Sequence, residues 1–164
     1  MSKTHDNFMA AFAGESQANR KYLAYAKQAE KEGLPHVAKL FRAVAEAETI
    51  HAHAHLRSAG KIGDTISNLK DAISGETYEF TKMYPEMIKD AEAEDERAAQ
   101  KYFSWVNDVE EVHSKLYAKA LEAQGKIEDV DYYICSVCGY THEGPHDEKC
   151  PVCGAAAKAF YKFQ

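Results

Sequence analysis

Apolar residues recur at three- and four-residue steps along most of the chain, which predicts a predominantly helical protein. The clearest example is the set Val37, Leu40, Phe41 and Val44. Glycine and proline separate the periodic segments and predict long helices over residues 4–32, 36–58, 65–90 and 95–124. Asp64 or Thr65 is expected to cap the third helix, and Pro85 is expected to kink or shorten it.

Acidic residues and histidines interrupt each of these apolar faces near its middle. In chain order they are Glu15, Glu48, His51, Glu76, Glu79, Glu110 and His113. An unpaired carboxylate in a protein interior is strongly destabilising, so acids at these positions need cations to compensate them. Oxygen ligands mixed with imidazole suit iron or manganese, and suit zinc less well. The pattern therefore predicts a metal site inside a helical domain.

The spacing of these residues indicates how such a site is divided along the chain. Glu48-x-x-His51 and Glu110-x-x-His113 each place two ligands one helical turn apart. Two such pairs, with a lone glutamate from each of the other two helices, form the ligand pattern of di-iron four-helix bundles. Glu15 and Glu76 are the lone glutamates, so each helical hairpin supplies half of the site. The residues leave open whether Glu79 is a ligand or accepts a hydrogen bond behind the ligands.

The chain ends in two Cys-x-x-Cys-Gly motifs, which predict a closed tetrahedral metal site. Their cysteines are Cys135, Cys138, Cys150 and Cys153. Zinc would make the site structural, whereas iron would make it a one-electron carrier. Iron is favoured beside a di-iron site, because that site must be resupplied with electrons. The intervening loop carries His142 and His146, which we expect to be solvated.

Composition and charge limit the possible partners of this 164-residue chain. The net charge is −6, and the acidic excess lies in residues 1–131, because residues 132–164 hold as many basic as acidic groups. That excess argues against nucleic acid and anionic membranes as partners. The N-terminal sequence lacks an apolar signal core, so we expect a cytoplasmic protein. We expect a helical domain over residues 1–125, a linker over 126–131 and a cysteine-rich domain over 132–164.

Taken together, these motifs resemble the rubrerythrin family over essentially the whole chain. The segments that carry the resemblance are AFAGESQANRKYL (11–23), AEAETIHAHAH (45–55), ISGETYEFTKMYPEM (73–87), VEEVHSKLY (109–117) and the cysteine-rich tail. The resemblance implies an all-α, four-helix ferritin-like bundle, followed by a small rubredoxin-like Fe(Cys)4 module with short β hairpins. It also implies a non-haem di-iron peroxidase that reduces hydrogen peroxide to water.

The resemblance further implies a role for each predicted ligand. Two non-haem irons would be held by Glu15, Glu48, His51, Glu76, Glu79, Glu110 and His113. One further iron would be held by Cys135, Cys138, Cys150 and Cys153. One of the paired irons would exchange Glu79 for His51 on reduction, which would make Glu79 a ligand. The chain lacks a G-x-G-x-x-G motif, so electrons are expected from a separate donor such as rubredoxin or an NAD(P)H-dependent reductase.

The link between the second and third predicted helices is short for a bundle with a long crossover. Eight steps of chain reach at most ~26–29 Å. To connect the end of the second helix to the start of the third, the link must cover ~30 Å along the bundle axis and a further ~8–10 Å between helix axes. We therefore expect a domain-swapped homodimer, in which the first two helices of one chain pair with the last two of another.

Two other functions are compatible with the same residues. One is a ferritin-like protein that oxidises or handles iron and whose tail binds structural zinc. The other is a metal-stabilised interaction module without turnover. The colour of the tail distinguishes both from the peroxidase: iron bound to thiolates absorbs visible light and supports the peroxidase, whereas a colourless tail supports one of these two functions.

Overall fold

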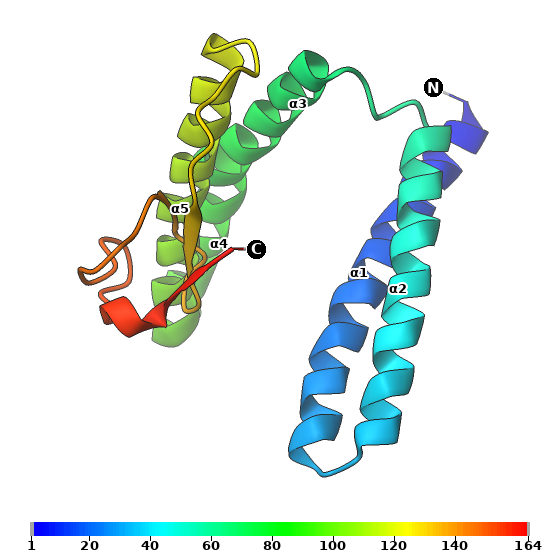
Figure 1. Ribbon diagram of the computed structural model, residues 1–164, viewed down its shortest axis with the longest axis horizontal. Helices are drawn as coiled ribbons and strands as arrows, with labels where there is room; N and C mark the ends of the chain where they lie inside the picture. The colour runs from blue at the N-terminus through cyan, green and yellow to red at the C-terminus, as the bar shows by residue number, and fades with distance from the viewer. Residues whose placement is uncertain (1, 164) are drawn as a thin grey trace. The chain divides into compact units, whose positions relative to one another are not determined.

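The computed structural model describes residues 2–163 and divides into two compact units, with the boundary between Gly63 and Asp64 (Figure 1). The first unit is entirely helical in its described part, and the second combines helices with a small sheet. Within residues 2–163, no helix is both long and apolar enough to cross a membrane.

The first unit is an antiparallel hairpin of two long helices, α1 (Lys3–Lys31) and α2 (Pro35–Ser58) (Figure 1). Gly33 ends the first helix in a left-handed conformation with φ of 73°, which glycine adopts without a steric penalty. Pro35 then occupies the first turn of α2, where its missing N–H costs no helical hydrogen bond. These two residues explain why the chain reverses where the sequence predicts.

Small residues form the contact between α1 and α2. The buried residues of the two helices are Ala26, Ala29, Ala38, Ala45 and Ala52. Asn19 adds a polar link, because its Nδ2 donates to the Ala45 carbonyl at 2.7 Å and to Thr49 Oγ1 at 2.8 Å. A longer side chain at these alanine positions would separate the helices, so this packing fixes the distance between the residues that α1 and α2 carry.

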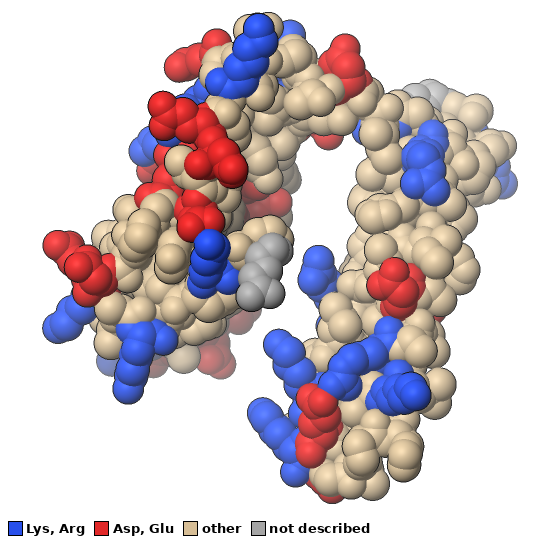
Figure 2. All heavy atoms as spheres, in the orientation of Figure 1, with Lys and Arg blue, Asp and Glu red and all other residues tan. Residues whose placement is uncertain are grey.

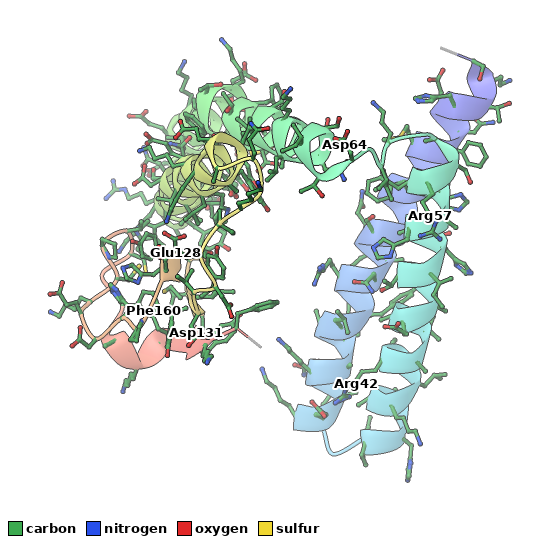
Figure 3. The ribbon with its side chains drawn as sticks, turned by 45° about the horizontal axis from the view of Figure 1, so that its top comes forward. Arg42, Arg57, Asp64, Glu128, Asp131 and Phe160 are labelled. Atoms are coloured by element: carbon green, nitrogen blue, oxygen red, sulfur yellow. The ribbon has the colours of Figure 1, made fainter. Side chains whose placement is uncertain are left out.

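The second unit begins with a helical hairpin whose first arm has three parts. These are α3 (Thr65–Tyr78), the π-helical turn η1 (Glu79–Met83) and α4 (Tyr84–Ala93), and the second arm is α5 (Arg97–Glu122). Asp64 caps α3, since its Oδ1 accepts the Ser67 N–H at 2.7 Å (Figure 3). Of the two caps expected from the sequence, the aspartate is therefore the one used.

Pro85 does not shorten this arm, which continues to Ala93, three residues beyond the predicted end. The π-helical turn over residues 79–83 lies just before the proline. A proline has no N–H and its ring collides with a carbonyl one turn earlier. The wider turn lies where a straight α-helix would meet that collision, and it begins at Glu79, one of the predicted site residues.

The cysteine-rich segment folds as a three-stranded antiparallel sheet. Its strands are β1 (Tyr132–Cys135), β2 (Thr141–Glu143) and β3 (Phe160–Lys162), in the order β2-β1-β3, and the short helix η2 (Ala157–Ala159) precedes β3. Val109 of α5 is buried in the same core as the cysteines, and Trp105 of α5 and Phe160 pack against that core. This segment is therefore joined to α5 by a shared apolar core within the second unit.

The acidic excess of the helical part is not uniform. Figure 2 shows lysine and arginine side chains gathered around the end of the hairpin where α1 meets α2. Basic residues outnumber acidic ones over residues 20–42. The net charge therefore conceals a local basic region on the first unit.

Candidate metal centres

The first unit brings three predicted ligands together, one from α1 and two from α2. They are Glu15, Glu48 and His51, and one ligand atom from each lies within 4.8 Å of the other two. His51 Nδ1 lies 2.8 Å from Glu48 Oε2. The Glu48 side chain is 15% exposed, whereas that of His51 is 56% exposed. The carboxylate is thus held inside the hairpin, and the imidazole lies at its surface.

The second unit contains the matching cluster, with one ligand from α3 and two from α5. Its members are Glu76, Glu110 and His113, and their ligand atoms also lie within 4.8 Å of one another. His113 Nδ1 lies 2.7 Å from Glu110 Oε2 and 3.9 Å from Glu76 Oε2. All three side chains are half-buried. The two units therefore each hold one lone glutamate and one Glu-x-x-His pair, as the sequence predicts.

Without a metal, Glu76 and Glu110 differ in how readily they bind a proton. Burial, the hydrogen bond with Glu110 and the charge of Glu110 together raise the pKa of Glu76 to about 7. Burial also acts to raise the pKa of Glu110, but hydrogen bonds with His113 and Glu76 outweigh it and leave this pKa lowered. Glu76 therefore holds a proton more readily than Glu110 does, and a cation bound beside both would replace that proton.

Glu79 lies near this second cluster but is not part of it. Burial raises the pKa of Glu79, and the charge of Glu110 raises it further. Tyr84 also faces the acids, because burial and the charges of Glu110 and Glu79 raise the pKa of its phenol. Tyr84 follows Glu76 and Glu79 along the same arm, and these electrostatic contacts place its hydroxyl near the acids. That all seven predicted ligands meet at one centre remains a prediction.

Two other residues near the predicted ligands have structural neighbours. Tyr22 packs against Tyr25 and Phe41, with ring centroids 6.3 Å apart in each case. His55 packs against Phe8, with centroids 6.0 Å apart. Both side chains therefore belong to the aromatic packing of the first unit.

Sequence reasoning missed one residue at the second cluster, Thr141 on β2. Its Oγ1 lies 3.2 Å from His113 Nε2, the ring nitrogen that faces away from Glu110. The same hydroxyl donates to the Gly139 carbonyl at 3.1 Å. The contact joins residues 28 positions apart, on a helix and a strand, so no local spacing could have revealed it.

The four cysteines form a third cluster, with the geometry of a tetrahedral metal site. Cys135 Sγ lies 3.7 Å from Cys153 Sγ, and Cys138 Sγ lies 3.6 Å from Cys150 Sγ. A tetrahedron with metal–sulfur bonds of ~2.3 Å has edges of ~3.75 Å. The sulfur atoms are therefore already at the spacing that a single tetrahedral metal ion requires.

Each Cys-x-x-Cys-Gly motif folds in the same way. The N–H of Gly139 donates to the Cys135 carbonyl, and that of Gly154 donates to the Cys150 carbonyl, both at 2.9 Å. Both glycines adopt left-handed φ angles, 85° and 74° respectively. This turn lets amide N–H groups face the sulfur atoms.

The amide contacts also affect the ionisation of the thiols. Burial acts to raise the pKa of Cys135, but hydrogen bonds from the N–H groups of Cys138 and Val137 outweigh it and leave the pKa lowered. Burial raises the pKa of Cys138 and of Cys153. Four neighbouring thiols cannot all ionise without a cation, whereas a thiophilic metal stabilises all four thiolates. The donor set therefore fits the iron that the sequence analysis favoured, as well as zinc.

The histidines of the cysteine-rich segment differ from expectation. His142 and His146 are half-buried, and their ring centroids lie 4.8 Å apart. His146 also packs against Phe160 at 4.2 Å. The expectation that both rings are solvated was wrong, because the loop folds back over the sheet and its aromatic residues.

Comparisons with known proteins agree with this arrangement. The rubrerythrin family model matches residues 6–121. A second family model, described as the rubredoxin-like domain of rubrerythrin, matches residues 133–161. The two matches cover the helical part and the cysteine-rich part in turn.

Individual relatives match over nearly the whole chain. Rubrerythrin-2 of Clostridium acetobutylicum is 34% identical over 98% of this chain and 96% of the relative. Nigerythrin of Nitratidesulfovibrio vulgaris is 35% identical over 93% of this chain and 83% of the relative. A solved structure of nigerythrin in a partially reduced state aligns with a TM-score of 0.59 and 32% identity, over 99% of this chain and 88% of that chain.

These matches confirm the predicted fold class, a ferritin-like four-helix protein with a rubredoxin-like module at its C-terminal end. They also confirm the predicted cofactors, which are the two non-haem irons of a di-iron carboxylate site and the iron of a four-cysteine site. Both family models match this chain, and relatives are about one-third identical to it over nearly its full length. The chain therefore belongs to the rubrerythrin family.

Proposed function

We propose that this protein is a peroxidase that reduces hydrogen peroxide to water and so protects against oxidative stress. The observation that carries the proposal is the presence of two complementary Glu/His clusters in a chain that also holds a four-cysteine site. The first two clusters together provide the ligands for a pair of irons, and the third provides a one-electron carrier beside them.

The reaction requires two electrons and two protons for each peroxide, and its only product is water. Iron held by the acidic residues supplies the electrons when it is bound there. The electrons are then restored one at a time through the four-cysteine site, from a separate donor such as rubredoxin or an NAD(P)H-dependent reductase.

The protein side chains have three roles in this proposal. Glu15, Glu48, Glu76 and Glu110 offset the positive charge of the metal pair, and His113 completes the set. Glu79 and His51 alternate as ligands between the oxidised and reduced states. The π-helical turn that begins at Glu79 and the exposure of His51 support such an exchange, because neither group is fixed by tight packing.

Tyr84 is proposed to hold a proton near the reacting oxygens. Burial and the charges of Glu110 and Glu79 raise the pKa of its phenol, so Tyr84 remains protonated at neutral pH. A protonated phenol can donate a hydrogen bond to a ligand carboxylate or to an incoming oxygen atom.

We further propose that a complete site requires two chains. The helical domain over residues 1–125 would form a bundle by exchange with a second copy, while residues 126–131 link it to the module over residues 132–164. In a bundle with a long crossover, the link must run along the bundle axis from the end of α2 to the start of α3. If Glu48 and Glu76 lie at the same level, that distance is the length of α2 after Glu48 plus the length of α3 before Glu76, or ~32 Å. The link from Ser58 to Thr65 spans at most ~25 Å. Because the link is shorter than this distance, we favour a domain-swapped homodimer. We also propose that the protein is cytoplasmic.

Mixing two inactive variants tests the swap directly. Glu48→Ala damages the first unit and Glu110→Ala damages the second. In a swapped heterodimer one site carries both defects and the other is fully wild-type, so mixing and reassociation should restore about a quarter of the wild-type sites. If the dimer is not swapped, every site keeps one defect and mixing restores no activity. Glu46→Ala, at an exposed position of α2, is the matched control.

Rapid mixing tests the peroxidase proposal. The fully reduced protein is mixed with hydrogen peroxide or with oxygen, and the visible absorption of the iron–thiolate site is followed. We expect peroxide to oxidise the protein much faster than oxygen does. A faster reaction with oxygen would contradict the proposal and favour an iron-oxidising role, and a colourless tail would indicate zinc in the four-cysteine site.

A further inference from the structure

We propose that Thr141 is a positioning residue for the metal pair: its hydroxyl holds His113 in the tautomer and ring orientation that direct Nδ1 toward the metal. The inference deepens the proposed function, because it rests on His113 being a ligand. It concerns a contact within the second unit, between α5 and β2 of the same chain.

Hydrogen-bond accounting assigns the proton on His113. A threonine hydroxyl has one hydrogen to donate, and Thr141 donates it to the Gly139 carbonyl at 3.1 Å. The hydroxyl oxygen can therefore only accept from His113 Nε2, which lies 3.2 Å away. The contact with Thr141 therefore requires a hydrogen on Nε2 of His113.

Nδ1, on the opposite side of the ring, forms a hydrogen bond with Glu110 in the metal-free protein; a bound metal would replace the proton of that bond and use the Nδ1 lone pair. Nδ1 faces Glu110 at 2.7 Å and Glu76 at 3.9 Å, which are the other two ligands of the cluster. Histidine ligands usually donate their second N–H to a fixed acceptor, which sets the ring orientation and increases the basicity of the binding nitrogen. Thr141 provides that acceptor here.

The corresponding histidine of the first unit is much more exposed. The His51 side chain is 56% exposed, and its Nδ1 forms a hydrogen bond with Glu48 of the same helix. The His113 side chain is 26% exposed and has partners on both ring nitrogens, one of them on a different element. The contrast gives a structural reason why His113 would remain a ligand while His51 exchanges with Glu79.

The position of Thr141 is fixed from both sides. On β2 it pairs with Ile134 of β1 in the antiparallel register. The glycine to which it donates lies close to α5, since a β-carbon at Gly139 would be 4.0 Å from Val109 Cγ1. Val109 is in turn buried in the core that contains the cysteines. Packing of the cysteine module on α5 thus determines where the hydroxyl lies.

Removing the hydroxyl and then restoring it tests the proposal. Thr141→Val keeps the branched shape that suits a strand, and Thr141→Ser keeps the hydroxyl. Full-length wild-type and variant proteins are compared by competition with a ferrous chelator, which measures the Fe²⁺ affinity of the carboxylate site. We expect Thr141→Val to lose at least about tenfold in affinity and Thr141→Ser to stay within about threefold of wild type.

The same samples distinguish positioning from general damage. The visible spectrum of the four-cysteine site should be identical in all three proteins. Wild-type affinity in Thr141→Val would overturn the proposal. So would an equal loss in Thr141→Ser, or loss of the visible spectrum in Thr141→Val, because either would show that the strand's packing, and not the hydroxyl, is what matters.

A second measurement reads the tautomer itself. In the full chain loaded with Zn²⁺ and labelled with ¹⁵N, His113 should show a slowly exchanging proton on Nε2, and Thr141→Val should speed its exchange at least about tenfold. A proton on Nδ1, or unchanged exchange in the variant, would overturn the proposal. Neither measurement involves peroxide, so failure of the proposed peroxidase activity would be seen separately, in the rapid-mixing experiment.

Discussion

At the scale of single residues, the properties of the acidic cluster follow from how close its carboxyl groups are. Glu76 and Glu110 approach each other inside a helical hairpin, where both cannot be charged without compensation. The protein solves this in two ways. Without metal, the raised pKa of Glu76 favours a proton on that carboxyl, and a bound cation would replace the proton. Metal binding at this cluster is therefore coupled to proton release.

This coupling predicts how the stability of the metal-free protein depends on pH. The pKa of Glu76 is about 7 in the folded protein, above its ordinary value of 4.5. The folded state thus binds a proton that the unfolded state has lost, so Glu76 stabilises the fold most at pH values below 4.5. That contribution is lost as the pH rises through about 7. Urea unfolding should therefore show lower stability at about pH 8 than at about pH 5.

Glu76→Gln provides the control for this prediction. Glutamine has a similar shape and no titratable proton, so the variant should show a clearly smaller decrease over the same pH range. An unchanged decrease would assign the pH dependence to other groups. His113 acts in the same direction, because its hydrogen bond with Glu110 raises its pKa.

The ligand types could be predicted from the sequence because each acid interrupts an apolar helical face. That signal is local, and it pointed to the members of both Glu/His clusters. The four cysteines have a local signal of their own, the two Cys-x-x-Cys-Gly motifs. Thr141 gave no such signal. A threonine on a short strand is ordinary, and its importance depends on a contact with α5 that forms only when the module folds onto the helix.

At the scale of elements, the hairpin of α1 and α2 depends on close packing of alanines and on one polar link. Asn19 donates from α1 to the Ala45 carbonyl and to Thr49 on α2. The link lies one turn from Glu15, so it helps to hold the first cluster in register. A half-buried amide that bridges two helices in this way contributes stability that neither helix has alone.

Asn19→Ala should therefore destabilise the protein by about 1–2 kcal/mol. The substitution removes two hydrogen bonds and leaves Thr49 without its partner on α1. Gln17→Ala is the matched control, because Gln17 is exposed on the same helix and should change stability by less than about 0.5 kcal/mol. Thermal unfolding followed by circular dichroism measures both. Equal effects of the two substitutions would show that the Asn19 link does not hold the hairpin together.

The helix boundaries could be predicted because glycine, proline and capping residues mark them. Gly33, Pro35 and Asp64 act where the sequence indicated. The π-helical turn at residues 79–83 could not be predicted. A proline can make a helix kink, end or widen, and the sequence does not show which of these occurs. Here the helix widens before Pro85 and continues to Ala93.

At the scale of the whole molecule, the chain consists of two units that each contain half of the proposed di-iron ligands. The family and the cofactors could be predicted because both metal motifs carry strong spacing signals. No residue motif indicates how the two halves of the site are brought together. The swapped dimer is thus predicted from chain length and helix geometry alone.

The central claim is that acidic residues of both units hold one pair of irons, and iron analysis of protein purified without air tests it most directly. Glu48→Ala and Glu110→Ala, which alter different units, should each remove most of the iron of the carboxylate site. Each variant should keep the iron of the four-cysteine site, as judged by its visible absorption. The exposed-site variants Glu46→Ala and Glu111→Ala should keep the wild-type iron content. Full iron content in either ligand variant, or iron bound only to the cysteines in the wild-type protein, would contradict the account.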